Sequence, residues 1–380
     1  MRVAIVGFGI GGGALAVALA RDGLEVTVFE QAASPGPVGA GFLLQPSGQA
    51  ALASLGLLDR VAAEGWPIRA FHAESAPGRT LTLMRYDRRD PASFALGVAR
   101  GRLFTTLMDA ATSAGVRVVT GARIVDARET RDSVAPLDGH GGEHGSFEVL
   151  VGADGMRSAL RRRVDPGSRL FLSPYAALWG LGRFDGPCPE RLRQQARGVG
   201  ILAGLLPVGE REMACFWGLR ATDVDALEGQ GFRALVERMD AVFPEARCVL
   251  EDIGGFDRLA IARYGYATLA RRYTGRIVLI GDAAHPSPPH LGQGANLALL
   301  DAVTLAQALR VERRPSVAFA RWDRRRRWQN ARYAYLSRVL SPFFQSSHGW
   351  LGPARDLALP AMGAVPPLRA FMEFVLAGRG

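Results

Sequence analysis

The chain has 380 residues, of which 48% are hydrophobic and 22% are charged, as in globular proteins with one or two domains. Its formal net charge is +10, and arginine supplies every basic side chain apart from histidine, because the sequence contains no lysine. These arginines are spread along most of the chain, and the one dense run, Arg324 to Arg327, lies in a predicted helix from Trp322 to Tyr335, so the charge does not indicate a nucleic-acid-binding protein.

Cysteine usage and the absence of long apolar runs indicate the cellular compartment. Cys188, Cys215 and Cys248 are odd in number and widely spaced, which fits neither a disulfide framework nor a zinc site and predicts buried thiols in a reducing compartment. No run of about 18 apolar residues predicts a transmembrane helix. Glycines from Gly7 to Gly13 interrupt the apolar N-terminus, which argues against a signal peptide. We therefore expect a cytoplasmic protein.

The N-terminal half predicts a βαβ unit followed by mixed elements. Arg2 to Val6 is a short apolar run typical of a buried strand, a helix is expected from Gly12 to Asp22, and Leu24 to Glu30 predicts the next strand. Gln31 to Gly48 is rich in Gly, Pro and Ala and predicts an ordered loop. The elements expected next are helices at 48–63 and 101–114 and strands at 71–86, 116–120, 123–129 and 146–151, the last two flanking a Gly-rich hairpin tip.

The pattern changes in the second half of the chain. Strand-like runs dominate from Ser173 to Ala262, with a hairpin turn at Pro207 to Glu210 and one helix from Gly231 to Phe243. A buried strand at Arg276 to Ile280 and a helix from Gly294 to Arg310 then resume the first pattern. The predicted fold class is α/β: a Rossmann-type domain with an inserted antiparallel β-sheet substrate domain and a C-terminal helical segment. The predicted boundaries are 1–70, 98–172 and 270–340 for the first domain, 71–97 and 173–269 for the second, and 341–380 for the helical cap.

A glycine-rich turn follows the first predicted strand. Gly7 to Gly12 reads GFGIGG, which matches GxGxxG between a strand and a helix, and Glu30 closes the next strand. Gly7 permits the tight turn, Gly9 lets the backbone approach a pyrophosphate, and Gly12 lets the helix pack closely on the strand. The helix N-terminus favours an anion. Because the negative charge of Glu30 suits ribose hydroxyls and disfavours a 2′-phosphate, the turn predicts FAD or NAD over NADP.

Two later motifs also follow predicted strands. Val151 to Ser158 reads VGADGMRS, and Gly281 to Pro286 reads GDAAHP and continues to Asn296. With three motifs in this order the chain resembles, from Met1 to about Arg310, the single-component (class A) flavoprotein aromatic hydroxylases, the para-hydroxybenzoate hydroxylase-like group. GFGIGG is similar to the FAD fingerprint of that family, GADGMRS to its DG motif and GDAAHP to its GD motif. The resemblance implies FAD as the cofactor.

The resemblance also implies roles for individual residues. Arg100 corresponds to the arginine of an R-x-x-L helix start that contacts FAD, Asp282 to the residue that holds the ribityl chain, and Pro289 to a residue against the flavin ring. Gly294 to Asn296 would place backbone N–H groups near the flavin N1 and C2 carbonyl, at a helix N-terminus that stabilises negative charge. The expected cofactor contacts are Gly7, Gly9, Ile10, Gly11, Gly12, Glu30, Gln31, Arg100, Asp154, Asp282, Pro289, Gly292, Gly294, Ala295 and Asn296.

Alternative interpretations stay open for Asp154 and for the loop after Glu30. For Asp154 the family role at FAD and NAD(P)H stands beside a role as a turn-capping aspartate. Many members of the family carry an arginine in the loop after the ribose-binding glutamate, whereas Gln31 to Gly41 has none here. Contacts to the pyrophosphate or to the nicotinamide donor can therefore differ from the family pattern.

The chemistry implied by the resemblance is an NAD(P)H- and O₂-dependent hydroxylation of an aromatic or polyketide-like small molecule through a flavin C4a-hydroperoxide. The cofactor supplies the difficult step, and the protein positions and desolvates the reacting groups and tunes the cofactor. Weak candidates for a group that activates a phenolic substrate are Tyr175, Arg183 and Trp217. Further candidates beside the ring, with Trp217 and Pro289, are Leu44 and Gln45, although packing roles are more common for all of them.

Two alternatives to a hydroxylase stay open: a flavin-dependent oxidase or reductase without hydroxylation, and a non-catalytic flavin-binding protein of a membrane surface. The tail from Pro342 to Val375 carries aromatic residues and arginines, but capping of the FAD domain is its more common role, so membrane contact is not expected. His140 to His144 matches H-x-x-E-H, yet its glycines disfavour the required helix, and no metal site is expected. The oligomeric state and the roles of His72, His285 and His290 are left open.

Overall fold

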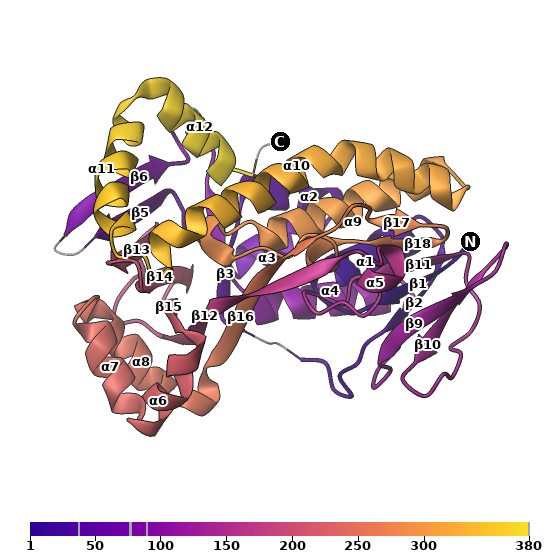
Figure 1. Cartoon of the computed structure of the whole chain (residues 1–380), viewed down its shortest axis with the longest axis horizontal. Helices are drawn as coiled ribbons and strands as arrows, with labels where there is room; N and C mark the ends of the chain where they lie inside the picture. The colour runs from indigo at the N-terminus through magenta and orange to yellow at the C-terminus, as the bar shows by residue number, and fades with distance from the viewer. Residues whose placement is uncertain (37–38, 76–77, 89, 379–380) are drawn as a thin grey trace.

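The computed structural model describes residues 1–36, 39–75, 78–88 and 90–378. A six-stranded sheet lies towards one end of the molecule and a seven-stranded sheet towards the other, and helix α10 (Pro315–Phe344) runs along one edge between them (Figure 1). Each of these sheets is assembled from segments that lie far apart in the sequence.

The six-stranded sheet has the order β17-β18-β11-β1-β2-β8. All neighbours are parallel except the edge strand β17, which pairs antiparallel with β18. The central strands are continuous Val, Ile, Leu and Ala runs, as expected where both faces of a parallel sheet are covered. The strands are β1 (Arg2–Val6), β2 (Glu25–Phe29), β8 (Arg117–Val119), β11 (Val149–Gly152), β17 (Tyr273–Thr274) and β18 (Ile277–Leu279).

Helices cover this sheet, and small residues bring two of them close together. In the first of these, α1, every residue from Ile10 to Leu19 is buried, and a Cβ added at Gly11 would lie 3.3 Å from the Ala298 Cβ of α9. Alanine and glycine on both helices therefore permit a close contact directly beneath the glycine turn. The helices on this side are α1 (Ile10–Arg21), α2 (Pro46–Ser54), α3 (Leu58–Ala63), α4 (Arg100–Ser113), α5 (Arg161–Val164), α9 (Gly294–Val311) and α10.

The seven-stranded sheet has the order β16-β12-β15-β14-β13-β5-β6. Its pairs are antiparallel except β13 with β5, so this sheet matches the antiparallel pattern predicted for 173–262. The β14–β15 hairpin turns at Glu210 and Arg211, slightly later than predicted, because the strand pairing continues through Pro207 to Gly209. The strands are β5 (Ala70–Ser75), β6 (Arg79–Arg85), β12 (Arg169–Arg183), β13 (Arg191–Arg197), β14 (Ile201–Gly209), β15 (Glu212–Arg220) and β16 (Ala260–Thr268).

One face of the seven-stranded sheet is covered by three short helices, α6 (Val224–Gly229), α7 (Phe232–Asp240) and α8 (Arg247–Ile253). The sequence predicted one helix here, which corresponds to α7. Helices of six and seven residues span too few turns to show a periodic apolar face, so α6 and α8 escaped the prediction. Short 3₁₀ turns lie at Ala221–Asp223, Pro244–Ala246, Phe256–Arg258, Gly281–Ala283 and Pro289–Leu291.

A three-stranded sheet of β3 (Gly41–Leu44), β7 (Ala95–Ala99) and β4 (Trp66–Ile68) packs on the opposite face. A Cβ at Gly97 would overlap the Pro207 carbonyl oxygen, and a Cβ at Gly41 would lie 2.6 Å from Val208. The two sheets therefore touch backbone to backbone at Gly97, and at Gly41 the backbone of β3 packs on side chains of the seven-stranded sheet.

The predicted hairpin between 123–129 and 146–151 is wrong. The strand β9 (Ile124–Glu129) pairs with β10 (Val134–Asp138), while the second predicted strand enters the six-stranded sheet as β11. The polar residues Arg131 to Ser133 form the turn between β9 and β10, and the glycine-rich stretch comes after β10. In that stretch His144 pairs with Asp138 (Nε2 to Oδ2, 2.9 Å), and His140 lies exposed in a turn, so this segment is a loop.

The C-terminal segment is helical, as predicted, with α11 (Leu351–Ala364) and α12 (Pro366–Leu376) following α10. Within the described residues, none of these or the other helices combines the length and apolar character needed to cross a membrane.

Cys188 and Cys215 are buried, Cys248 is half-buried, and all three are free thiols. Burial raises the pKa of Cys188 to about 11 and that of Cys215 to about 12, so both stay protonated and unreactive at neutral pH.

Candidate functional site

The three sequence motifs meet at the carboxyl ends of three neighbouring parallel strands. Strand β1 leads into the glycine turn, β11 into the DG segment and β18 into the GD segment, and β1, β11 and β18 are adjacent in the sheet. A Cβ at Gly7 would lie 2.6 Å from the Ala153 carbonyl oxygen, so the first two motifs are in contact. Ligands of open α/β sheets bind at this edge.

The glycine turn has the geometry that an anion site needs. Gly7 has φ +97°, a conformation that favours glycine, and a Cβ at Gly12 would overlap the Gly7 carbonyl oxygen. Gly9 is exposed, and a Cβ built on it meets no atom of the described chain within 4 Å. No acidic residue lies in the first turn of α1, which leaves its N–H groups and dipole free for a pyrophosphate.

The carboxylate of Glu30 fixes the turn that precedes this helix. Its Oε2 accepts a hydrogen bond from the Phe8 N–H at 2.8 Å, and its Oε1 accepts one from the Ala32 N–H at 2.9 Å. Each carboxylate oxygen has a second acceptor site, so both can still take a ribose hydroxyl. Gln31 is exposed beside it.

Arg161 ties the DG segment to the GD segment. Its buried guanidinium donates to the carbonyl oxygens of Ala283 (2.9 Å), Met156 (2.7 Å) and Asp282 (3.0 Å). Asp154 lies beside it: Oδ2 accepts from the Ala159 N–H at 2.8 Å, whereas the buried Oδ1 has no partner in the part of the chain that the structure describes. Burial raises the pKa of Asp154. Arg161 lies three residues beyond the end of the GADGMRS motif.

A second buried network supports the GD segment from below and was not predicted. The carboxylate of Asp301 on α9 accepts from His285 Nε2 (2.6 Å), Arg326 Nε (2.8 Å) and the Gly281 N–H (3.1 Å). Burial alone would raise the pKa of Asp301, but the charges and hydrogen bonds of His285 and Arg326 outweigh it and hold that pKa well below its usual range. His285 therefore has a structural partner under the motif.

The loop from Pro289 to Asn296 ends at the N-terminus of α9. The side chain of Asn296 is fully buried: Nδ2 donates to the carbonyls of Leu43 and Gly292, both at 3.1 Å, and Oδ1 accepts from the Gln45 N–H at 2.9 Å. This side chain therefore joins the loop to the end of β3, and only its backbone remains for a ligand. The first N–H groups of α9, those of Gly294 to Asn296, have no partner inside the helix.

Exposed positions surround these amides. Asp282, Pro289 and Gly292 are exposed although the residues on either side of them are buried or half-buried, and a Cβ at Gly292 meets no described atom within 4 Å. Arg100 is also exposed at the start of α4, next to Gly39. Together with Gly9 they leave the accessible surface along which an extended dinucleotide can lie.

The end of β3 brings a buried amide to this loop. Leu44 and Gln45 are both fully buried, and Gln45 Oε1 accepts from the Tyr86 hydroxyl at 2.7 Å. The Gln45 Nε2 atom is buried and has no hydrogen-bond partner among the described residues. An amide nitrogen whose two N–H donors are unused inside a protein is ready for a ligand acceptor.

Aromatic side chains and an unpartnered histidine lie on the other side of the loop. His290 packs edge-on against Tyr264 (centroids 6.3 Å apart) and stacks on Phe344 (6.0 Å), and neither ring nitrogen has a hydrogen-bond partner in the described chain. Tyr264 clusters with Tyr175, whose buried hydroxyl is likewise unpartnered, while Tyr264 itself donates to Gln345. Burial lowers the pKa of His290 to about 4, so the imidazole is neutral at physiological pH.

Two other predicted candidates lie elsewhere. Trp217 is buried in the cluster that joins the sheet to α6–α8, on the face opposite β3. Arg183 is exposed at the end of β12, where its backbone N–H donates to Asp252. His72 lies on β5 and contacts Thr80 (3.2 Å) on the neighbouring strand.

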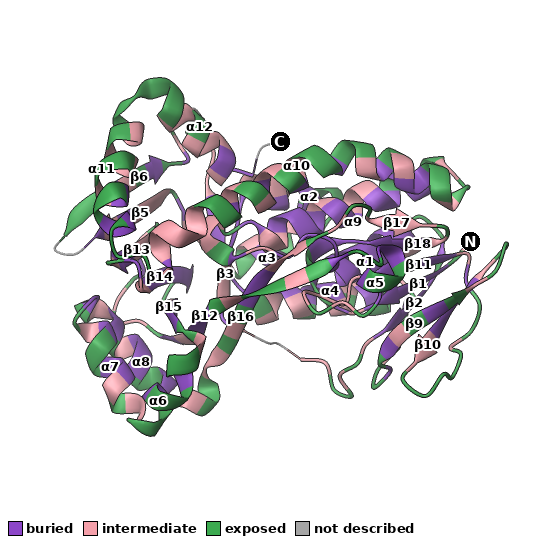
Figure 2. Cartoon of the chain, viewed as in Figure 1, coloured by how far each residue is buried: buried purple, intermediate pink, exposed green. Residues whose placement is uncertain are grey.

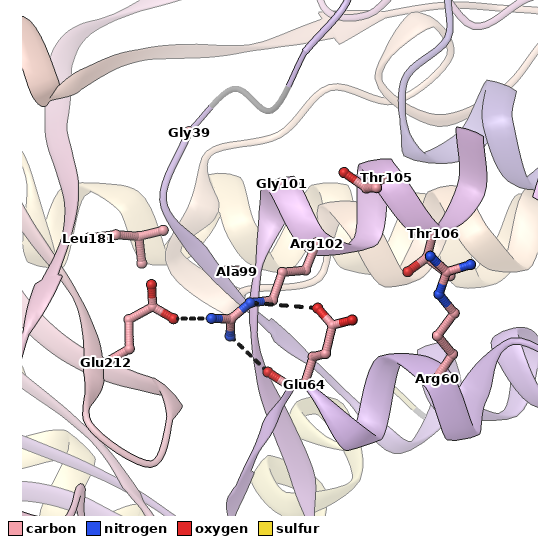
Figure 3. A pocket seen from close by; sticks show the side chains of 10 residues that line it. All are labelled: Gly39, Arg60, Glu64, Ala99, Gly101, Arg102, Thr105, Thr106, Leu181 and Glu212. Carbon is pink, nitrogen blue, oxygen red and sulfur yellow. Dashed lines mark hydrogen bonds and ion pairs between the residues drawn. The ribbon is translucent and has the colours of Figure 1, made fainter. Parts of the chain in front are cut away.

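A cavity of about 480 Å³ opens between α3, α4 and the β12–β15 edge (Figure 3). Arg102 crosses it, with Nη2 donating to Glu212 (2.6 Å) and Nη1 to the Glu64 carbonyl (2.8 Å). Figure 3 shows this guanidinium between the two acidic side chains, which neutralise it. The second arginine of the lining, Arg60, pairs with Asp109, so the cavity offers little positive charge to a phosphate.

The residues present fit FAD. The uncapped helix N-termini of α1 and α9, the ribose-type carboxylate of Glu30, and the open glycines between them match a dinucleotide with a polar ring at one end. The chain matches the family described as "FAD binding domain" over residues 1–316. The chain belongs to this family of FAD-binding proteins.

Individual flavoproteins resemble this one over nearly their whole length. Aurachin C monooxygenase/isomerase of Stigmatella aurantiaca is 30% identical over 85% of this chain and 84% of its own, and 3-hydroxybenzoate 6-hydroxylase of Polaromonas naphthalenivorans is 28% identical over 91% and 88%. The crystal structure of Pseudomonas aeruginosa PqsL with 2-aminobenzoylacetate has a TM-score of 0.79 at 26% identity and covers 93% of this flavoprotein and 98% of that chain. Klebsiella pneumoniae HpxO complexed with FAD and uric acid shares the fold, with a TM-score of 0.84 at 23% identity and coverage of 100% and 97%.

These findings confirm three predictions for the flavoprotein: the α/β fold with a Rossmann-type FAD-binding unit, FAD as the cofactor, and an FAD-dependent monooxygenase as the enzyme class. The predicted contacts of individual residues with FAD and substrate stay predictions, as do the domain boundaries. What the structure adds is their arrangement: the glycine turn, Glu30, Asp154, Asp282 and the start of α9 lie along one edge of the sheet.

Proposed function

We propose that this flavoprotein hydroxylates an aromatic small molecule that binds beside the Pro289–Asn296 loop, between FAD and the sheet face that carries Tyr175. The observation that carries the proposal is a set of buried polar groups without partners in the described chain: the Gln45 Nε2, the Tyr175 hydroxyl and both ring nitrogens of His290. Buried polar atoms are normally paired, so these atoms await a ligand. A planar molecule with polar edges would satisfy them.

The residues of the chain would hold FAD by the contacts already described. The glycine turn would bind the pyrophosphate, Glu30 the ribose, and Asp282 the ribityl chain. Bound FAD, reduced by NADH or NADPH, supplies the two-electron activation of O₂ for aromatic hydroxylation. The N-terminus of α9 would stabilise negative charge at the ring edge next to Gly294 to Asn296.

His290 is the group that we assign to substrate recognition. Its neutral imidazole has one donor and one acceptor nitrogen, so it can accept a phenolic O–H or donate to a ring carbonyl. Tyr264 and Phe344 flank the imidazole and present apolar surface to an aromatic ring. The hydroxybenzoate and aminobenzoylacetate in the names of the relatives carry oxygen on or beside an aromatic ring, which supports this substrate class.

The test is a substrate screen with the purified holoprotein. NADH and NADPH oxidation would be measured with a panel of hydroxybenzoates, aminophenones and hydroxyquinolines, and products would be analysed after reaction under ¹⁸O₂. We expect one class to stimulate oxidation and to gain one ¹⁸O atom per product molecule. Stimulated oxidation with hydrogen peroxide but no labelled product would show an oxidase and overturn the hydroxylase proposal.

The role of His290 is tested separately once a substrate is in hand. His290→Phe keeps the ring contacts but removes both nitrogens, and we expect kcat/KM to fall roughly tenfold to hundredfold with FAD content unchanged. His72→Phe, which changes a histidine on the distant strand β5, serves as the control. Equal effects of the two substitutions would remove His290 from the substrate site.

A further inference from the structure

The charge of this protein is concentrated at its C-terminal end. Residues 313–380 contain twelve arginines and three acidic residues, whereas the preceding 312 residues contain 34 arginines and 33 acidic residues. Arginines are spread through the whole chain, but carboxylates become scarce in the last three helices. Nearly all of the net charge of +10 therefore lies on α10, α11 and α12 and the residues around them.

One side of α10 carries three arginines followed by two aromatic residues. Arg321, Arg324 and Arg325 are exposed, and within the described residues none of them has a carboxylate within 4 Å. Trp328 is 73% exposed and Tyr335 is 65% exposed, at helical spacing from these arginines. We call these five residues the basic stripe. Aromatic rings beside cations are typical of the boundary between water and lipid.

The hairpin of α11 and α12 has an apolar surface that faces solvent. From Leu357 to Leu368 the chain reads LALPAMGAVPPL, without a charged residue. Leu357 is 71% exposed, Val365 44%, Leu368 41% and Phe371 46%, and these four residues are called the apolar tip. Figure 2 shows exposed and half-buried segments along α11. Exposed apolar clusters of this kind mark interaction sites.

The basic stripe belongs to α10 and the apolar tip to α11, α12 and the turn between them, and these helices follow one another along one edge of the molecule. Helix α10 runs along that edge, and α11 and α12 project at its C-terminal end (Figure 1). We propose that this edge docks on an anionic lipid bilayer, with the apolar tip in the interfacial layer and the basic stripe against headgroup phosphates. The surface would hold the enzyme on the membrane without a spanning helix, as amphipathic surface elements do.

Charge complementarity selects lipid over the other occupants. A second copy of the chain would bring two arginine-rich edges together, which like-charge repulsion opposes. A nucleic acid would pair with the stripe but would leave the apolar tip in water. An anionic bilayer satisfies both parts, because arginines meet phosphates while leucine, valine and phenylalanine leave water.

The experiment is co-sedimentation of the full-length holoprotein with vesicles of pure phosphatidylcholine and of phosphatidylcholine mixed with phosphatidylglycerol. We expect binding to the mixed vesicles only. The triple variant Arg321→Gln, Arg324→Gln, Arg325→Gln should bind roughly a hundredfold more weakly, since each arginine near the surface contributes about fivefold. The triple variant Leu357→Ser, Leu368→Ser, Phe371→Ser should also lose binding, by at least tenfold.

The control variant changes three exposed arginines that lie outside α10, α11 and α12, Arg117→Gln, Arg123→Gln and Arg162→Gln, which alters the net charge equally. It should bind like the wild type. Bound FAD and the unfolding midpoint of each variant verify that it is folded. The proposal is overturned if the wild type does not sediment with the mixed vesicles, or if the control loses as much binding as the stripe variant. Self-association that the tip variant abolishes, without vesicle binding, would assign the edge to a second copy.

Discussion

At the scale of single residues, the site is built from side chains that bind backbone. Glu30 holds the glycine turn through Phe8 and Ala32, and Asn296 holds β3 through Leu43 and Gln45. Arg161 binds carbonyls of both the DG and the GD motif. The sequence predicted Glu30 and Asn296 as cofactor contacts because their positions match motifs. It could not predict their protein partners, which lie up to 253 residues away in the chain.

His290 gives a pH-dependent prediction at this scale. A histidine in the unfolded chain has a pKa near 6.5, whereas burial lowers the pKa of His290 to about 4 in the folded protein. The unfolded state therefore binds more protons between these values, so the free energy of unfolding falls as pH drops from about 6.5 towards 4. At about pH 4, the lower end of this interval, the loss of unfolding free energy attributable to His290 is of the order of 3 kcal/mol.

The measurement is urea unfolding of the wild type and His290→Phe across this pH range. We expect the variant to show a flatter pH dependence, with the difference confined to that interval. His140→Gln, which removes a histidine exposed in a turn, should follow the wild type. Parallel curves for the wild type and His290→Phe would mean that His290 keeps an ordinary pKa in the fold.

At the scale of elements, predictability followed periodicity and length. The runs at Arg2 to Val6 and Arg276 to Ile280 were recognisable because strands buried on both faces are continuously apolar. The short helices α6 and α8 gave no periodic signal, and β10, with Pro136 in it, read as part of a loop. The position of the motifs on the chain predicted the site, since each follows such a strand. The pairing of β9 with β10 depends on tertiary contacts that no local pattern shows.

The contact between the three-stranded and seven-stranded sheets yields a second prediction. A methyl group at Gly97 would overlap the Pro207 carbonyl oxygen, so Gly97→Ala must force β7 and β14 apart. We expect the free energy of unfolding to fall by about 2–3 kcal/mol. Gly200→Ala is the matched control, because a Cβ there meets no described atom within 4 Å and should change stability by no more than about 0.5 kcal/mol. Denaturant unfolding measures both, and equal values would show that the sheets can separate freely.

At the scale of the whole molecule, the N-terminal motif and the C-terminal helix both lie near the Pro289–Asn296 loop, which we call the flavin loop. The first motif lies in β1 and α1, the last lies before α9, and the end of α12 returns to that same loop. Gln293, which immediately precedes α9, donates through Nε2 to the carbonyls of Leu376 (2.8 Å) and Val375 (3.4 Å). Tyr333 of α10 donates to the Val375 carbonyl at 2.7 Å. Hydrogen bonds thus hold the C-terminal helix from two sides, from Gln293 before α9 and from Tyr333 of α10.

Substitutions can remove the hydrogen bonds of Gln293 and of Tyr333 one at a time. Gln293→Leu removes the donor on the flavin loop, and we expect amide hydrogen exchange in α12 to accelerate about tenfold, because loss of the hydrogen bond to the Leu376 carbonyl costs roughly 1–2 kcal/mol. The FAD dissociation constant should rise severalfold, since Gln293 holds the residue before the free amides of α9. Tyr333→Phe removes a hydrogen bond to the same helix from outside the loop, so it should accelerate exchange in α12 but leave the FAD dissociation constant unchanged. If both variants weaken FAD binding equally, the order of α12 as a whole, and not the Gln293 contact, supports the flavin loop.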